Sequence, residues 1–486
     1  MFPLVSLTLL LPVIGALALW LLPKKHSQYS HAIAVITTGL TLLGSIGVWL
    51  KGIGSGFSQV EEVTWIPSLD AAYRVGVDGI SLPLILLTTT LFLVSAIYSI
   101  KIKKQPSTYA ALFLLLETAC LGVFMALDMI LFYAFFELSL VFMYFIIAGW
   151  GHENRRRASL TFFIYTLLGS LPLLLAIIAL YLGSGTFDMR AIIADPPLTG
   201  VIGLFATIMM LIAFAVKIPV VPLHSWLPIA HVEAPTAGSV ILAGVLLKLG
   251  TYGLIRFALQ MTPDQLAQLA TIVVAFGVIA AIYGALAAMA QTDLKRLVAF
   301  TSINHMGYVV IAIGGAAVLS GQAFYFALDG AVLQMVSHGI VTGMLFLLVG
   351  MIKDRFGTKD LDNLRSLLTS APLTAGLFIF GAFASLGLPG LAHFPAELQI
   401  FLGSFEAYPV AVVIAVVGVL FMAALYLRAI SISFLPKAEK GVKEAFAISR
   451  PEAFSVLPLA ALTLLIGIAP GIILTLVHAT TTSLGL

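Results

Sequence analysis

Four ionisable side chains lie inside stretches of sequence that are otherwise apolar: Glu137, Lys217, Lys248 and Glu397. A charge in hydrocarbon costs several kcal/mol, so such groups persist where they pair, face water or change protonation state. Buried acids and amines that change protonation state are the groups from which a path for protons is built. We therefore expect these four residues to pass protons, or another small cation, through the protein interior.

The alternative for Glu137 is a static ion pair with one of the two lysines, which would only hold helices together. A static ion pair with Glu137 would need only one lysine, and the presence of two buried lysines favours the relay. Glu117 also lies within an apolar stretch. Two roles stay open for Glu117, a place on a secondary proton path or a polar contact between helices.

Histidines extend this set. His305 and His338 lie between Lys248 and Glu397 in the sequence. An imidazole exchanges protons near neutral pH and has a nitrogen on each side. Each histidine alone fits a core residue bonded to a backbone carbonyl, whereas the pair between two buried charges indicates connecting proton carriers.

Prolines interrupt two of the apolar stretches beside these charges. The first stretch is broken after Lys217 by Pro219, Pro222, Pro228 and Pro235, and the second is broken before Glu397 by Pro389 and Pro395. Proline removes a backbone donor, and in lipid every freed carbonyl must find another partner. Interrupted helices at matching places in two halves of a transporter mark an ion path. His224 and His231 lie in the first break, where they either cap broken backbone or admit protons from the cytoplasm.

The composition decides the class of protein that holds these residues. Of the 486 residues, 60% are hydrophobic and 10% are charged. A soluble domain carries about 25% charged residues, so this surface faces something other than water. Most stretches between charged clusters reach the length of roughly 20 residues that a helix needs to cross a bilayer. The composition predicts an all-α polytopic membrane protein.

The hydrophobic stretches predict fourteen transmembrane helices, of which the seventh and twelfth are discontinuous. The predicted spans are 3–22, 31–51, 81–102, 109–127, 129–149, 159–182, 199–219, 238–259, 270–290, 297–316, 329–350, 372–402, 409–434 and 455–478. The broken helices are fourth in two sets of five, and an odd number of spans per set makes the repeat inverted. We therefore divide the chain into 1–105 (helices 1–3), 106–260 (first repeat), 261–435 (second repeat) and 436–486 (a loop and helix 14).

The basic residues predict the orientation. Eighteen fall on one side of the predicted spans: Lys24, Lys25, Lys101, Lys103, Lys104, Arg155, Arg156, Arg157, Lys295, Arg296, Lys353, Arg355, Lys359, Arg365, Lys437, Lys440, Lys443 and Arg450. Four fall on the other side: Lys51, Arg74, Arg190 and Arg256. Short basic loops stay in the cytoplasm, so both termini are expected on the periplasmic or lumenal side.

Several classes of site are not expected. The single cysteine, Cys120, excludes a disulfide framework and a thiolate-bound cluster. The histidines show no convincing metal-binding spacing, and no phosphate loop or other pattern for a nucleotide or a nucleic acid occurs.

At these residues the sequence resembles the antiporter-like proton-pumping subunits of respiratory and photosynthetic complex I (NDH-1), of the subunit 4 type that includes NuoM and NdhD. The matching segments are 136–144, 217–228, 231–239, 246–253 and 293–308. The resemblance implies an entrance pair, a central lysine, two connecting histidines and an exit residue. In this sequence they are Glu137 with Lys217, then Lys248, His305 with His338, and Glu397.

The resemblance also implies partners and location. The chain would bind no redox cofactor, because NAD(P)H or ferredoxin and the quinone act elsewhere in the complex. It would be a non-redox subunit of a proton-translocating quinone oxidoreductase, surrounded by lipid and by other membrane-arm subunits, including further antiporter-like ones. The membrane would be a bacterial inner membrane or a thylakoid membrane.

The sequence departs from this family in two places. Ala392-His-Phe-Pro-Ala396 stands where a Gly-Phe or Asn-Phe followed by small residues is expected, which makes His393 an added proton carrier and leaves the exit geometry open. The loop 435–454 lacks an expected acidic and basic motif. Both departures indicate a divergent paralogue, such as the type specialised for carbon dioxide uptake.

Other functions remain as alternatives. The nearest is a cation/proton antiporter subunit of the multi-subunit sodium type, or a hydrogenase-linked proton pump subunit. A scaffold with inactive charges and a lipid-modifying enzyme are further from the pattern, because the former leaves two buried lysines without a purpose and the latter lacks a nucleophile.

Overall fold

The computed structural model describes residues 3–364, 366–435 and 446–484. Arg365, Lys437, Lys440 and Lys443, which were counted on the basic side, lie outside the described residues, as does half of the loop 435–454. Thirteen described helices are long and apolar enough to cross a membrane. The predicted all-α membrane fold is confirmed.

Twelve predicted spans each contain one long helix. These helices are α1 (Leu4–Leu21), α2 (Ser30–Leu50), α3 (Ser81–Tyr98), α4 (Pro106–Met125), α5 (Met129–Trp150), α6 (Arg155–Ser184), α8 (Gly200–Lys217), α12 (Pro263–Met289), α13 (Leu294–Ala316), α14 (Gly321–Phe356), α18 (Pro409–Ser433) and α19 (Arg450–Ile468). The eighth predicted span is a helical run of α10 (Thr236–Ile241), η4 (Leu242–Leu246), α11 (Leu247–Gly253) and η5 (Leu254–Leu259). Shorter helical pieces connect them: η1 (Lys24–Tyr29), η2 (Pro67–Leu69), η3 (Ser99–Lys101), α7 (Met189–Ala194), α15 (Leu367–Ser370) and η6 (Thr482–Leu484).

The two predicted helix breaks are present. In the first, α8 ends at Lys217 and α9 (Trp226–Glu233) follows after a non-helical segment. In the second, the twelfth predicted span is split into α16 (Pro372–Ser385) and α17 (His393–Phe405). Together with the thirteen longer helices, this broken helix brings the number of described crossings to fourteen.

The fourteenth span is wrong in one respect, since it was expected to be continuous over 455–478. The structure ends α19 at Ile468 and begins α20 (Gly471–Thr481) after Pro470. Proline has no backbone N–H to continue the helical ladder, and Pro470 therefore separates the two helices.

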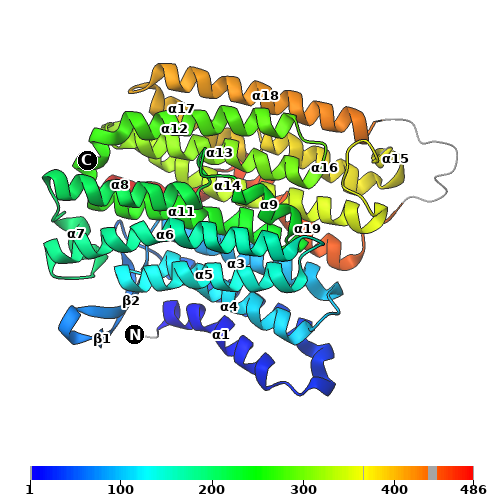
Figure 1. Ribbon diagram of the computed structural model, residues 1–486, viewed down its shortest axis with the longest axis horizontal. Coiled ribbons are helices and arrows are strands. Elements are labelled where there is room, and N and C mark those ends of the chain that lie inside the picture. Colours follow the sequence, from blue (N-terminus) through cyan, green and yellow to red (C-terminus); the bar gives the residue numbers. More distant parts are fainter. Residues whose placement is uncertain (1–2, 365, 436–445, 485–486) are drawn as a thin grey trace.

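The helices run side by side along the long axis of the molecule, with α1 at one edge and α18 at the other (Figure 1). Both termini lie toward the same end as α7 and the hairpin of β1 and β2, while α15 lies at the opposite end. The run α10–η5, together with α13 and α14, is buried along its entire hydrophobic stretch. In contrast, α18 and α19 are buried over only a third of theirs, so the core is the central three crossings.

A hairpin of β1 (Ser58–Ile66) and β2 (Ala71–Val77) covers the end of the bundle that holds the termini, and no feature of the sequence predicted it. Arg74 in β2 forms ion pairs with four carboxylates: Glu62 at 2.8 Å, Asp70 at 2.7 Å, Asp128 at 3.2 Å and Asp188 at 3.8 Å. The Asp128 carboxylate also accepts from two backbone N–H groups of the first turn of α5 and thus caps that helix. Arg74 therefore joins the hairpin to the start of α5.

Arg256 was counted among the residues of the side that holds the termini. It lies in η5 beside Asp78, which directly follows β2, and is 1% exposed. Its guanidinium contacts Asp78 at 2.5 Å, and both side chains are buried. The positive charge is tolerated inside the bundle because this carboxylate neutralises it.

We predict that Arg74→Met destabilises the protein by about 3–5 kcal/mol, because it leaves the buried Asp128 carboxylate without its cation. The matched control is Arg190→Met, which removes a half-buried arginine that also binds Glu62 and should cost at most about 1 kcal/mol. The measurement is thermal unfolding of the detergent-solubilised chain. Equal losses in the two variants would contradict a central role for Arg74.

The same experiment has a pH dependence. The hydrogen bond from Arg74 lowers the pKa of Glu62 below its ordinary value of 4.5. This contribution to stability is therefore complete above pH 4.5 and is lost as the pH falls through the lowered pKa. Arg74→Met should show a weaker loss of stability on acidification than the unaltered chain.

Candidate functional site

The ammonium group of Lys248 lies in the centre of the bundle. Its Nζ donates to the Ala243 carbonyl at 2.6 Å and lies 2.6 Å from Nδ1 of His338. Both Lys248 and His338 are completely buried. An ammonium group only donates, so Nδ1 of His338 accepts while Lys248 is protonated. No ion pair to Lys248 occurs among the described residues, so loss of its proton would break none.

Irregular backbone around Lys248 provides its carbonyl partner. The π-helical turns η4 and η5 flank α11, which carries Lys248. In such turns the backbone bonds skip a residue, which removes some carbonyls from the regular ladder. Lys248 reaches back to Ala243 within η4, so the side chain takes up a carbonyl that the distorted helix leaves available.

His305 lies beside His338, as predicted for connecting residues. Their ring centroids are 5.5 Å apart. Nε2 of His305 is 3.0 Å from the carbonyl of Ser385, the last residue of α16. The last carbonyls of a helix lack a helical partner, and a carbonyl only accepts. This nitrogen therefore carries a proton and caps the broken helix.

Glu397 and His393 complete the central cluster from α17. Oε1 of Glu397 is 3.9 Å from Nε2 of His305 and 3.9 Å from Nδ1 of His393. Residues four apart share one face of a helix, which places His393 and Glu397 together. The His393 ring lies 4.6 Å from the ring of His305 and 6.3 Å from that of His338. His393 thus lies among the predicted carriers.

Lys217 is the last residue of α8, where the negative end of the helix favours a cation. Its Nζ is 3.4 Å from Oγ of Ser139 on α5. Glu137 lies on the same helix, but no ion pair joins it to Lys217 within the part of the chain that the structure describes. Tyr133 and Ser170 lie beside the Glu137 carboxyl instead. A static bridge between Glu137 and Lys217 is therefore absent.

The helices that carry the two lysines touch. Gly250 lies two residues after Lys248, and a Cβ added to it would be 3.0 Å from Cβ of Lys217. A larger residue at this position would push α8 away from α11. The glycine keeps Lys217 next to the backbone that carries Lys248, and this links the first half of the predicted relay to the central cluster.

Three further predicted residues lie outside these contacts. Glu117 on α4 is completely buried, and neither of its carboxylate oxygens makes a hydrogen bond. His231 in α9 stacks on Phe346 with ring centroids 4.6 Å apart. His224, between α8 and α9, packs edge-on against Tyr283 at 4.8 Å. The structure brings Lys248, His305, His338, His393 and Glu397 together in the central cluster and leaves Glu117, His224 and His231 outside it.

Sequence reasoning missed Ser139, Gln334 and Gly387. Gln334 donates to Oε1 of Glu397 at 3.4 Å and lies four residues before His338, a helical spacing that was visible in the sequence. Gly387 has a φ of +69°, and a Cβ on it would lie 2.5 Å from Oε2 of Glu397. Nothing in the sequence indicates that the backbone approaches the carboxylate so closely.

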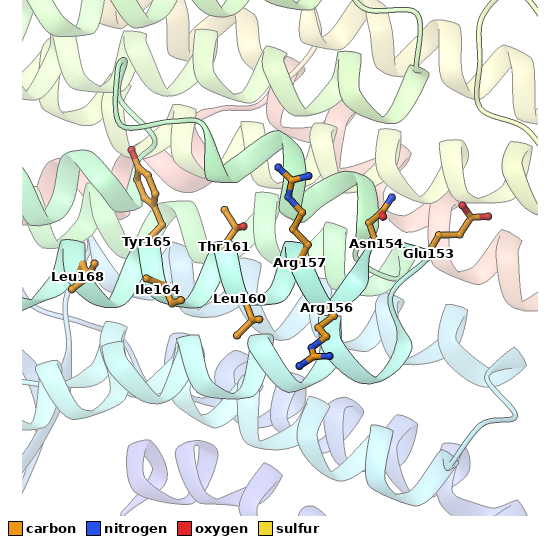
Figure 2. Close-up of a pocket in the computed structure, with 9 residues that line it drawn as sticks. All are labelled: Glu153, Asn154, Arg156, Arg157, Leu160, Thr161, Ile164, Tyr165 and Leu168. Atoms are coloured by element: carbon orange, nitrogen blue, oxygen red, sulfur yellow. The ribbon is translucent and has the colours of Figure 1, made fainter.

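A wide groove of about 750 Å³ lies elsewhere, along α6 (Figure 2). Figure 2 shows Arg156 and Arg157 near the start of the helix and Leu160, Ile164 and Leu168 further along it. This order, basic residues followed by an apolar face, suits a helix that contacts lipid headgroups and acyl chains. No residue of the central cluster lines the groove, so it is separate from the site.

Comparison with known proteins shows the family of the chain. The profile of the family described as NADH:quinone oxidoreductase/Mrp antiporter, transmembrane, matches residues 126–422. NADH-quinone oxidoreductase subunit M of Rickettsia typhi is 38% identical over 98% of this chain and 97% of its own length. The chain belongs to this family. The matched range contains every residue of the central cluster.

Further relatives are consistent with this family. NADH-quinone oxidoreductase subunit M of Escherichia coli K12 is 38% identical over 97% of this chain and 95% of its own length. Among solved structures, a chain of respiratory complex I from Thermus thermophilus superimposes with a TM-score of 0.88 at 31% identity, covering 99% of this chain and all of that one. A chain of the Mrp complex from Dietzia gives a TM-score of 0.87 at 20% identity, which shows the fold alone.

We predict that Gly387→Ala reduces proton transport by about tenfold or more in membranes that contain the chain, because the added methyl group displaces the Glu397 carboxylate. The matched control is Gly390→Ala. Gly390 also has a positive φ, but a Cβ on it would meet nothing within 4 Å. Both variants carry similar backbone strain of about 1–2 kcal/mol, so equal transport in the two would show that the position of Glu397 is unimportant.

Proposed function

We propose that this chain is an antiporter-like, proton-translocating membrane subunit of an NADH:quinone oxidoreductase. Its relay consists of Glu137, Lys217, Lys248, His305, His338 and Glu397, with His393 as an added carrier. The observation that carries this proposal is the contact of Lys248 with His338 in the buried centre of the bundle. From there His305 leads to Glu397.

The proton path runs along the middle of the membrane. Lys217 passes a proton to Lys248 across the contact of α8 with α11. The proton then moves by His338 and His305 to Glu397, with water molecules bridging the distances that exceed a hydrogen bond. Histidine suits the connecting positions because one nitrogen takes up a proton while the other releases one.

Glu137 adjusts the proton affinity of Lys217 by moving. At 4 Å and an effective dielectric constant of about 20, an ion pair gains roughly 4 kcal/mol. An interaction of that size changes an equilibrium constant about a thousandfold. In the conformation described, Ser139 rather than Glu137 contacts Lys217, which corresponds to the state in which the lysine is not held by the acid.

Protons are taken up beside the broken seventh helix. A pocket of about 630 Å³ lies there, lined by residues that include His152, Glu233, Lys353 and Lys359, and it adjoins His231 in α9. Burial and the nearby lysines lower the pKa of His152 to about 3. His152 is therefore neutral at physiological pH, and Glu233 is the acceptor that the pocket offers to an incoming proton.

The energy comes from outside the chain. Subunits named NADH-quinone oxidoreductase work within a larger enzyme, and quinone reduction there would drive the movement of Glu137. We assign no redox cofactor to this chain, and its partners are the neighbouring membrane-arm subunits and lipid. The repeats 106–260 and 261–435 supply one broken helix each, α8–α9 and α16–α17.

The relay predicts that Lys248→Met abolishes proton translocation. In inverted vesicles, quinone reduction by NADH should drive proton uptake at a rate at least about tenfold lower, because the central carrier is missing. Lys104→Met is the control, since Lys104 is exposed and its Nζ contacts only the Gly149 carbonyl. Vesicles with the complex assembled and pumping at the normal rate after Lys248→Met would disprove the relay. Omission of sodium should leave proton uptake unchanged, which separates this function from a sodium antiporter.

The orientation that we propose places η1 in the cytoplasm and the hairpin on the opposite side. Gln28→Cys and Ser55→Cys put a reactive thiol at each end of the bundle, and the only native cysteine, Cys120, is buried. A membrane-impermeant maleimide should label Gln28→Cys in inverted vesicles and Ser55→Cys in right-side-out vesicles. The reverse pattern would overturn the orientation.

A further inference from the structure

We propose that His305, His393 and Glu397 form a binding site for a divalent transition-metal ion, for which Zn²⁺ is the best fit, and that occupation of the site blocks the relay. Binding of the ion does not depend on the proposed function, whereas the block of proton transfer rests on it. The three residues each offer one ligand atom, and these atoms all lie within 4.8 Å of one another.

The distances are close to those of a metal site. A tetrahedral Zn²⁺ ion with bonds of 2.0–2.1 Å separates its ligand atoms by about 3.4 Å. Oε1 of Glu397 is 3.9 Å from a nitrogen of each histidine. An ion therefore needs the side chains to approach by only about half an ångström on these two edges, which small side-chain rotations supply.

The donor set suits zinc. Two histidines and one glutamate with an open fourth position are a ligand combination that zinc enzymes use. His393 and Glu397 lie four residues apart on α17, so they face the same point, and His305 reaches it from α13. His393 lacks a hydrogen bond at both ring nitrogens although it is completely buried. A buried polar group without a partner carries a free-energy penalty, which a bound ion would remove for one nitrogen.

Neighbouring groups support the ligands. Gln334 donates to Oε1 of Glu397 at 3.4 Å, and the backbone of Thr301 lies beside the His305 ring. Such contacts orient metal ligands and raise their affinity. Binding at Nε2 of His305 exchanges its bond to the Ser385 carbonyl for a bond to the ion. The ring changes tautomer, with the Nε2 proton released and a proton taken up at Nδ1, so the imidazole stays neutral. Glu397 is the most exposed of the three ligands, at 6%.

Occupation would stop proton transfer for two reasons. The ion uses the lone pairs of His305 and His393 and the carboxylate of Glu397, which are the groups that receive protons. Its double positive charge also opposes protonation of Lys248, which reaches the cluster through His338. The metal site and the relay therefore exclude each other.

The binding test uses Co²⁺ as a coloured probe with the full chain, purified in detergent without a polyhistidine tag. We expect one Co²⁺ per chain with the visible absorption of a four- or five-coordinate ion, displaced by Zn²⁺. His393→Asn and Glu397→Gln should each weaken binding at least about a hundredfold, since each removes a ligand. His478→Gln, which alters an exposed histidine paired with Asp329, should leave it unchanged. Absence of the bands in the unaltered chain, or equal binding by His393→Asn, would overturn the site.

The functional test applies Zn²⁺ to the assembled complex in vesicles from the side that holds the termini. We expect proton translocation to fall by at least about tenfold at saturation, and the Zn²⁺ concentration for half-inhibition to rise in His393→Asn but not in His478→Gln. A chain that binds Co²⁺ as described and still pumps normally with Zn²⁺ bound would keep the site and overturn the block, and with it the passage of protons through these three residues.

Discussion

The structure depends on one constraint: a backbone carbonyl that leaves a helix inside a bilayer must find a donor in the protein. Side chains supply these donors at both broken crossings. Trp226 donates to the Val216 carbonyl at 3.0 Å next to the end of α8, and Ser337 donates to Ala392 at 2.9 Å before α17. His305 and Lys248 do the same for Ser385 and Ala243. Two of the groups that hold the irregular backbone, His305 and Lys248, are therefore also members of the proposed relay.

The need of irregular backbone for protein donors explains why the central crossings are buried on all sides. The run α10–η5 with α13 and α14 contributes Lys248, His305 and His338, and the hydrophobic stretches of all three are fully enclosed. Contact with lipid would leave the distorted turns η4 and η5 without partners. The outer helices have regular backbones and can face acyl chains, as the groove along α6 illustrates. The fold thus keeps its π-helical turns where protein surrounds them.

The sequence alone predicted the membrane spans and the two helix breaks, but it did not predict the π-helical turns or the hairpin. Hydrophobic length predicted the spans, and prolines predicted the breaks after Lys217 and before Glu397, because both signals are local. The π-helical turns around Lys248 contain no proline, and they follow from packing against distant helices, which a single sequence does not display. The hairpin was missed because its stabilising partners, such as Asp128, lie far along the chain from Arg74. The proximity of His393 to His305 has the same origin, since two separate helices bring the rings together.

The two ends of the relay differ in how an acid is used. At one end, Glu137 and Lys217 share neither a hydrogen bond nor an ion pair within the described residues, and Ser139 contacts the lysine with a neutral hydroxyl. At the other end, Glu397 lies within 3.9 Å of two imidazoles and is fixed by Gln334 and by the close approach of Gly387. An acid that moves, as proposed for Glu137, can change the proton affinity of its lysine. An acid held in place, such as Glu397, can only accept a proton that reaches it. We propose that control lies at the Glu137 end and release at the Glu397 end, with Lys248 between them in contact with the Ala243 carbonyl and His338.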